Sequence, residues 1–193
     1  MSAVTARSPR HASDAELLSQ LIGTQECQRL YSGSLQPFFG RDTPEGVPAQ
    51  CLVARELVKR WLAEELAGRT VFAAPEAVTD YLKLHFAGRE YESFVVLYVD
   101  AQNCLMAVEE LFRGTLTQTS VYPREVVKSA LRINAAGVMF SHNHPSGSTN
   151  PSRADEHLTQ TLKAALALVD VRVLDHLIIA GNCSLSFAER GLI

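Results

Sequence analysis

Cysteine is scarce in this chain of 193 residues, and its four cysteines lie far apart. They are Cys27, Cys51, Cys104 and Cys183. They form no CxxC pair, which argues against a zinc knuckle and against a dithiol redox motif. Isolated cysteines of this kind are typical of reduced core residues in a cytosolic protein. We therefore expect a cytoplasmic location.

Long apolar runs and an excess of positive charge are also missing. No apolar run approaches the roughly 18 residues that a transmembrane helix needs, so we expect no membrane partner. The polar N-terminal residues 1–14 lack the apolar segment of a signal peptide. The net charge of −3 gives no sign of a strongly basic nucleic-acid-binding protein, although it leaves room for a local basic patch. The composition, 47% hydrophobic and 20% charged, is that of a globular protein.

The N-terminal third predicts a tail followed by a small helical unit. Residues 1–12 are polar and aperiodic, so a disordered tail is expected. Residues 13–23 predict a short helix that begins with a capping box. Residues 31–50 are rich in Gly, Pro and Ser and predict a loop, whereas residues 51–67 have apolar side chains at helical spacing. We interpret residues 13–68 as a helical N-terminal unit.

The remainder predicts alternating strands and helices. Residues 93–99, SFVVLYV, form an apolar run typical of a strand buried on both faces. Residues 104–114 predict a second strand, antiparallel to the first, and residues 136–140 predict another buried strand. A further strand is expected over residues 171–181, and helical patterns separate these elements. The alternation indicates an α/β fold over residues 70–193, with a mixed β-sheet flanked by helices.

The segment SHNHPSGSTNPSRAD, residues 141–155, contains the residues best suited to chemistry. His142 and His144 end an apolar strand, and residues two apart in a strand project from the same face. A loop containing proline and glycine follows, and a helix is expected from Ser152, with Asp155 in its first turn. Such a loop can fold back and bring Asp155 beside the two histidines.

Two imidazoles and one carboxylate are the ligand set of a catalytic zinc site, in which a fourth position stays open. Zinc in such a site lowers the pKa of water and polarises a carbonyl group, and a glutamate usually serves as the general base. A structural interpretation is equally compatible with these residues. Histidine pairs occur by chance in loops, and Ser152 with Asp155 can simply form a capping box. Both interpretations stay open at this point.

The spacing His-x-His, seven residues, Ser, two residues, Asp resembles the JAMM motif of JAB/MPN metalloprotease domains, whose fold is cytidine-deaminase-like. Several surrounding blocks are similar to bacterial RadC proteins: EELFRGTL (109–116), VYPREVVKSAL (121–131), HNHPSG (142–147) and VRVLDHLIIAG (171–181). They occur in the same order as in that family, from about residue 90 to 187. The chain is therefore identified, by resemblance, as a member of the RadC branch of JAB/MPN domains.

The resemblance implies a role for each matching residue. The ligands of one Zn²⁺ ion per chain would be His142, His144 and Asp155. Ser152 matches a serine that helps to stabilise an oxyanion. The family's general-base glutamate lies just before the first apolar strand, where Glu92 stands, and Glu109 and Glu110 are rivals because they also flank a strand. The implied activity is zinc-dependent hydrolysis of a peptide, isopeptide or other amide bond in a protein or peptide substrate.

Two departures from the family pattern weaken parts of this inference. Asn143 stands between the two histidines, where many JAMM proteases have Ser or Thr, although Asn is usual in the RadC branch. RadC proteins also usually carry a helix-hairpin-helix-like unit, whose glycine-rich hairpin presents backbone N–H groups to DNA phosphates. Here the hairpin is reduced to TPEGVPAQ, with Gly46 beside the acidic Glu45. We expect this degenerate unit to pack as helices and not to bind DNA strongly.

Other functions remain to be weighed. The main alternative is a DNA-repair-associated accessory or DNA-binding protein of RadC type without protease activity. Arg113 and Arg124 would then form a basic rim for an anionic partner. A silent binding module is a third possibility, but silent MPN domains generally lack the ligand set that this chain retains. His176 lies in a block typical of RadC proteins. We interpret it as a hydrogen-bonded structural residue in preference to a group that supports the metal site.

Overall fold

A computed structural model describes the chain except for these residues: 1–8, 10–11, 40–45, 67–69, 72–74 and 115–120. The predicted disordered tail therefore lies almost wholly outside the described residues, as does the first part of the TPEGVPAQ hairpin. The chain separates into two compact units, Met1–Val58 and Lys59–Ile193. The division falls inside a helix, whereas the sequence pattern places it after that helix, at residue 68. No helix in the described ranges is long and apolar enough to cross a bilayer.

The described residues of the first unit form α1 (Asp14–Ile22), α2 (Thr24–Leu30), α3 (Gln36–Phe39) and the N-terminal part of α4 (Ala49–Leu66). Ser13 and Glu16 form the predicted capping box at the start of α1. The short α3 corrects the prediction of an uninterrupted loop over residues 31–50. Phe38 explains it, because this side chain is only 1% exposed and anchors the turn in a small apolar core.

The second unit contains a five-stranded sheet and three further helices. The strands are β1 (Ser93–Val99), β2 (Leu105–Arg113), β3 (Gly137–Asn143), β4 (Arg172–Ala180) and β5 (Cys183–Ser186). The helices are α5 (Pro75–Phe86), α6 (Pro123–Ile133) and α7 (Arg153–Ala167). The strand order is β2-β1-β3-β4-β5, with β3 and β4 parallel and the other neighbours antiparallel. The predicted α/β class with a mixed, helix-flanked sheet is confirmed.

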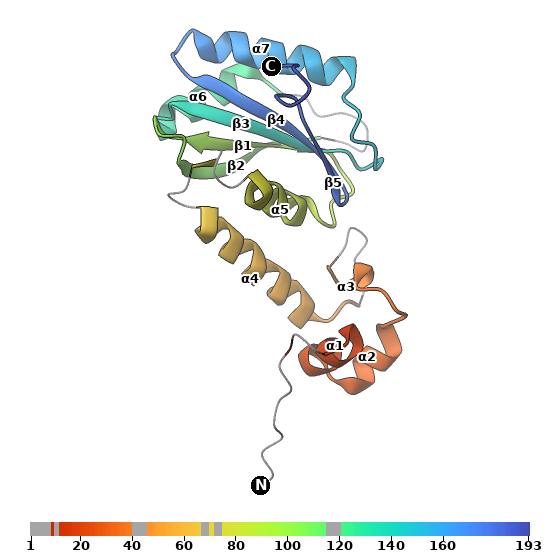
Figure 1. Cartoon of the computed structure of the whole chain (residues 1–193). Coiled ribbons are helices and arrows are strands. Elements are labelled where there is room, and N and C mark those ends of the chain that lie inside the picture. The colour runs from red at the N-terminus through yellow and green to blue at the C-terminus, as the bar shows by residue number, and fades with distance from the viewer. Residues whose placement is uncertain (1–8, 10–11, 40–45, 67–69, 72–74, 115–120) are drawn as a thin grey trace. The chain divides into compact units, whose positions relative to one another are not determined.

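Helices cover both faces of this sheet (Figure 1), with α5 on one side and α6 and α7 on the other. Strand β1 is buried along its whole length, as its apolar sequence predicts. Alternate side chains of a strand point to opposite faces, so Val95 and Leu97 pack toward α5, whereas Phe94 and Val96 pack toward α6 and α7. In β3 the same alternation places His142 on the α6–α7 face.

Candidate metal centre

Three potential ligands meet where β3 ends and α7 begins. His142 lies in β3, His144 follows the strand, and Asp155 is in the first turn of α7. The two Nε2 atoms are 2.9 Å apart, and they lie 3.4 and 3.6 Å from the carboxylate oxygens of Asp155. Ligand atoms about 2.0–2.1 Å from a tetrahedral zinc ion are roughly 3.4 Å apart. The spacing of the three side chains therefore fits one zinc ion, and the group could hold a metal.

The loop between β3 and α7 folds back because its backbone is tied to its own histidine. The Nδ1 atom of His144 lies 2.8 Å from the carbonyl oxygen of Ser148. Gly147 adopts a positive φ of 85°, which an L side chain rarely adopts, and its N–H donates to the carbonyl of His144. Because a carbonyl oxygen can only accept, the Ser148 contact places the proton of His144 on Nδ1 and leaves the Nε2 lone pair facing Asp155.

Asp155 serves the helix and the candidate metal centre at the same time. Ser152 caps α7, and its Oγ accepts a hydrogen bond of 3.1 Å from the N–H of Asp155. One carboxylate oxygen, Oδ2, accepts a bond of 2.7 Å from the N–H of Ser152, while Oδ1 faces His142. The capping box expected from the sequence is therefore present, and it aims the carboxylate at the histidines. The structural and functional interpretations of this motif are compatible.

The charges of this cluster favour a cation. Burial by itself would raise the pKa of Asp155, but interactions with His142 and His144 outweigh it and hold that pKa far below its usual range. The neighbouring carboxylate of Asp155 raises the pKa of His144, against the opposing effect of burial. A negative carboxylate thus lies in a partly buried site beside two imidazole nitrogens. Its charge can be balanced by a proton on His144 or by a metal ion.

Zinc affinity is expected to fall as the pH is lowered, because zinc and a proton compete for Nε2 of His144. Since the pKa of His144 is raised above the ordinary histidine value of about 6.5, the competition begins above that pH. The same shift makes the zinc-free protein gain stability below about pH 6.5, and this gain is lost as the pH rises through the raised pKa. Zinc titration calorimetry and thermal unfolding across this range test both effects. A zinc affinity that stays constant down to about pH 6 would contradict this prediction.

A pocket of about 450 Å³ opens beside the three potential ligands. One part of its wall is polar: Ser146, Ser148, Asn150 and Ser152. Another part is apolar: Phe94, Val121, Ala154 and Leu158. Two carboxylates, Glu92 and Asp155, also line it, and no described lining residue is a lysine or an arginine. Among the described residues, the pocket thus offers hydrogen bonds and apolar surface but no lysine or arginine to pair with an anionic substrate.

Glu92 is the one of the three candidate bases that lies in this pocket. Burial raises its pKa, although the two histidines of the cluster act in the opposite direction. A raised carboxyl pKa suits a group that must take up and release a proton near neutral pH. Glu109 instead accepts hydrogen bonds of 2.6 Å from Ser129 and Arg132. Glu110 forms an ion pair with Arg89 on the edge of the sheet.

Asn143, the residue between the two histidines, fixes the backbone on both sides of Glu92. Its Oδ1 accepts a hydrogen bond of 2.8 Å from the N–H of Ser93, and its Nδ2 donates one of 2.9 Å to the carbonyl of Tyr91. The side chain is only 5% exposed, and its bond with Ser93 is buried while that with Tyr91 is partly buried. An asparagine at this position therefore has a local structural role, because the shorter side chain of Ser or Thr would not span these two groups.

Replacing Asn143 with alanine is expected to lower the free energy of unfolding by about 1–3 kcal/mol, because the buried N–H of Ser93 and the partly buried carbonyl of Tyr91 lose this partner. Urea denaturation monitored by circular dichroism would measure the loss. Asn182→Ala is the matched control, since Asn182 is an exposed asparagine in the described turn between β4 and β5. Equal stability of the two variants would show that the Asn143 bonds contribute little.

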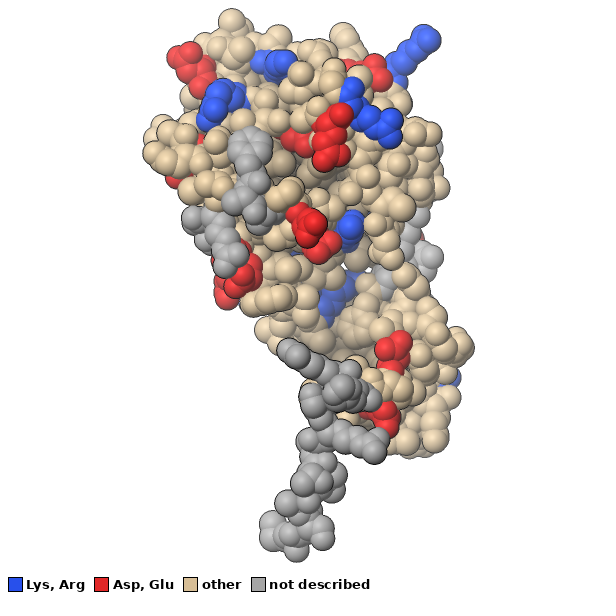
Figure 2. All heavy atoms as spheres, viewed as in Figure 1, with Lys and Arg blue, Asp and Glu red and all other residues tan. Residues whose placement is uncertain are grey.

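The arginines proposed as a basic rim do not line the pocket. The guanidinium of Arg113 stacks on the ring of Tyr91, 3.8 Å from its centroid, and Arg124 is an exposed residue of α6. On the face shown in Figure 2, basic and acidic side chains are interspersed. Ser148 and Thr159, which contact His144 and His176, carry no signal in the sequence, because neither belongs to the His-x-His motif.

A mixed sheet between helices, with two histidines at the end of β3 and a carboxylate at the start of α7, defines a JAB-type α/β domain. The family described as "RadC-like JAB domain" matches residues 72–192. The chain belongs to this family, which confirms the resemblance to RadC proteins seen in the sequence.

Curated relatives of this chain carry the description "UPF0758 protein". The relative from Acidovorax sp. (strain JS42) is 63% identical over 145 residues, which cover 75% of this chain and 61% of that protein. The relative from Acidovorax ebreus (strain TPSY) is 49% identical over 221 residues, covering 97% of this chain and 93% of that protein. This alignment is longer than the 193 residues of the chain. Some residues of that relative therefore have no counterpart here.

Proposed function

We propose that this protein is a zinc-dependent hydrolase that cleaves a peptide, isopeptide or related amide bond. One observation carries the proposal: two imidazole nitrogens and a carboxylate converge within 2.9–3.6 Å at the wall of a pocket that also contains Glu92. Three protein ligands leave a fourth zinc position open, which distinguishes catalytic from structural sites. The family membership is compatible with this chemistry.

The side chains around the pocket can divide the reaction between them. A bound zinc ion would supply Lewis acidity, polarising a substrate carbonyl and lowering the pKa of water. Glu92 would accept the proton of the attacking water and pass it to the leaving amine nitrogen. Ser152 would donate a hydrogen bond from its hydroxyl to the oxyanion, since the Oγ accepts from the N–H of Asp155 and the residue lines the pocket.

The pocket supports an amide substrate in preference to an anionic one. Hydrolysis of a phosphodiester usually requires two metal ions, whereas the described residues contain one cluster of potential ligands. A free C-terminal carboxylate would also find no lysine or arginine in the described lining. We therefore propose that the scissile bond is internal to a chain or links a side chain. Phe94, Val121 and Leu158 would then contact an apolar group next to that bond.

Elemental analysis of the purified protein, beside the His142→Ala/His144→Ala double variant, is the first test. We expect about one zinc ion per chain in the wild type and none in the variant. A peptide library analysed by mass spectrometry would then identify cleaved bonds, with chelator-treated protein as the control. The proposal fails if neither protein holds metal after zinc is supplied and the excess is removed.

The DNA-associated alternative remains a prediction from the sequence. The interspersed charges in Figure 2 show no continuous basic surface on that face. Salt-dependent retention of the protein on DNA, lost on charge reversal of Arg113 and Arg124, would support the alternative. The same measurement on the zinc-depleted protein would show whether the two functions are linked.

A further inference from the structure

A chain of buried hydrogen bonds connects His142 with the helix that carries Asp155. Nδ1 of His142 lies 2.8 Å from Nε2 of His176 in β4, and Nδ1 of His176 lies 2.6 Å from Oγ1 of Thr159 in α7. Thr159 in turn donates to the backbone carbonyl of Asp155, 2.7 Å away. The contacts therefore run from one potential ligand through two other side chains to the backbone of another.

The direction of every hydrogen bond in this chain follows from the group at its end, which is the carbonyl oxygen of Asp155. The carbonyl oxygen of Asp155 can only accept, so the single hydroxyl proton of Thr159 is used there. The Thr159 oxygen then accepts from Nδ1–H of His176, which leaves Nε2 of His176 as an acceptor. That atom accepts Nδ1–H of His142, and Nε2 of His142 keeps its lone pair toward His144 and Asp155. Every proton in the chain is thereby assigned without reference to a metal ion.

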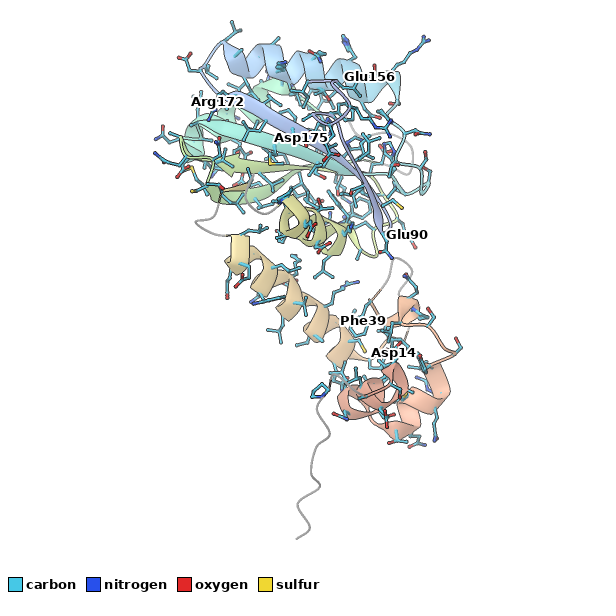
Figure 3. All side chains as sticks on the ribbon, viewed as in Figure 1. Asp14, Phe39, Glu90, Glu156, Arg172 and Asp175 are labelled. Carbon is cyan, nitrogen blue, oxygen red and sulfur yellow. The ribbon has the colours of Figure 1, made fainter. Side chains whose placement is uncertain are left out.

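The ring of His176 is enclosed by other side chains. The side chain is 0% exposed, and its ring contacts those of Phe94, Phe140 and Phe187, with centroids 4.7–5.8 Å away. These rings cannot replace the two hydrogen bonds of the imidazole. The backbone N–H of His176 is held by Asp175, which lies on β4 in Figure 3.

Asp175 is itself held by residues at and just after the end of β5. It accepts hydrogen bonds from the hydroxyl of Ser186, at 2.6 Å, and from the N–H of Ala188, at 2.9 Å. The backbone of His176 is thus held by a hydrogen bond, and its ring is held by contacts with aromatic rings. Its two nitrogens are directed at His142 and Thr159, which lie on different elements.

We propose that His176 and Thr159 are positioning residues that hold His142 in the tautomer able to bind a metal through Nε2. They also set the distance between β3 and α7, because the hydrogen bonds join the strand of one ligand to the helix of another. The assignment of the Nδ1–H tautomer to His142 depends only on the hydrogen bonds, whereas its effect on zinc binding rests on the proposed function. Groups that orient metal ligands typically contribute 10–100-fold in affinity.

Nuclear magnetic resonance of the zinc-free protein tests the tautomer directly. Couplings from the ring C–H protons to ¹⁵N-labelled imidazole nitrogens distinguish Nδ1–H from Nε2–H rings. The spectra would be recorded at about pH 9, well above the ordinary histidine pKa of ~6.5. We expect His142 and His176 both to be protonated on Nδ1. An Nε2–H tautomer at His142 would overturn the proposal, because that ring could not present its lone pair to zinc.

Zinc affinity of full-length variants, measured by competition with a chelator, tests the consequence. Thr159→Val keeps the side-chain shape but removes the hydroxyl, and we expect it to weaken zinc binding about 10–100-fold. Thr159→Ser keeps the hydroxyl and should remain within about threefold of the wild type. Thr161→Val is a matched control, because Thr161 lies two residues further along α7 and makes the same bond from its hydroxyl to the carbonyl four residues back, that of His157, on the exposed surface.

The outcomes separate this inference from the proposed function. Equal zinc affinity of Thr159→Val and Thr161→Val would overturn the positioning role, even if the wild type binds zinc. A wild type that binds no zinc would overturn the proposed function, and the tautomers in the zinc-free protein would still decide the hydrogen-bond assignment. If Thr159→Val does not fold, the wild-type spectra and the Thr159→Ser affinity provide the test. Zinc binding by Thr159→Ser that is weakened as much as we expect for Thr159→Val would also count against the proposal.

Discussion

Asp155→Asn is expected to abolish stoichiometric zinc binding while the fold is retained. The substitution removes the only negative charge among the three potential ligands, so the site loses the attraction that compensates for taking a divalent cation out of water. The amide oxygen of asparagine can still accept the hydrogen bond from the N–H of Ser152, so the cap of α7 persists. We expect zinc affinity to fall by more than the ~10–100-fold typical of groups outside the ligand set.

Glu156→Gln is the matched control for this change. Glu156 is the next residue of α7, labelled in Figure 3, and lies in the same first turn, so its neutralisation alters the helix charge in the same way. Zinc content by elemental analysis and thermal unfolding by circular dichroism would be measured for both variants. Retention of one tightly bound zinc ion in Asp155→Asn would show that the carboxylate is not a ligand.

Glu92→Gln is expected to retain zinc but to lower the turnover number by about 10²–10⁴-fold, the usual contribution of a general base. Glutamine has nearly the same shape as glutamate but cannot accept a proton from water. The backbone around residue 92 remains fixed, because Asn143 and the N–H of Gly114 hold main-chain atoms and not the carboxylate. Zinc content and the rate of cleavage of a peptide identified in the library would be measured together.

Glu90→Gln provides a control on the same segment, since Glu90 is exposed and does not line the pocket. Glu109→Gln should instead reduce stability, because it weakens the contacts with Ser129 and Arg132. An unchanged turnover number in Glu92→Gln would exclude the residue as the base. A loss of turnover in Glu109→Gln at full stability would move that role to β2.

Several features of this protein follow from residues close together in the sequence. The alternation of a β-strand is enough to place the side chains of His142 and His144 on one face. Ser152 and Asp155 are three residues apart, so their reciprocal hydrogen bonds depend only on the first turn of α7. The apolar run at residues 93–99 likewise predicts a fully buried strand. Local patterns were less informative for α3, where burial of a single aromatic side chain decided the conformation.

The amino-acid sequence by itself determined the mixed α/β class, the potential ligand set and the capping box, because strand and helix periodicity are local properties. Tertiary structure decided which other groups reach the site. Antiparallel pairing of β1 with β3 places Phe94 opposite His142, and so brings Glu92 to the pocket from 50 residues away. Parallel pairing of β3 with β4 brings in His176. The register of such pairings depends on how whole sheet faces pack, which no short stretch of sequence specifies.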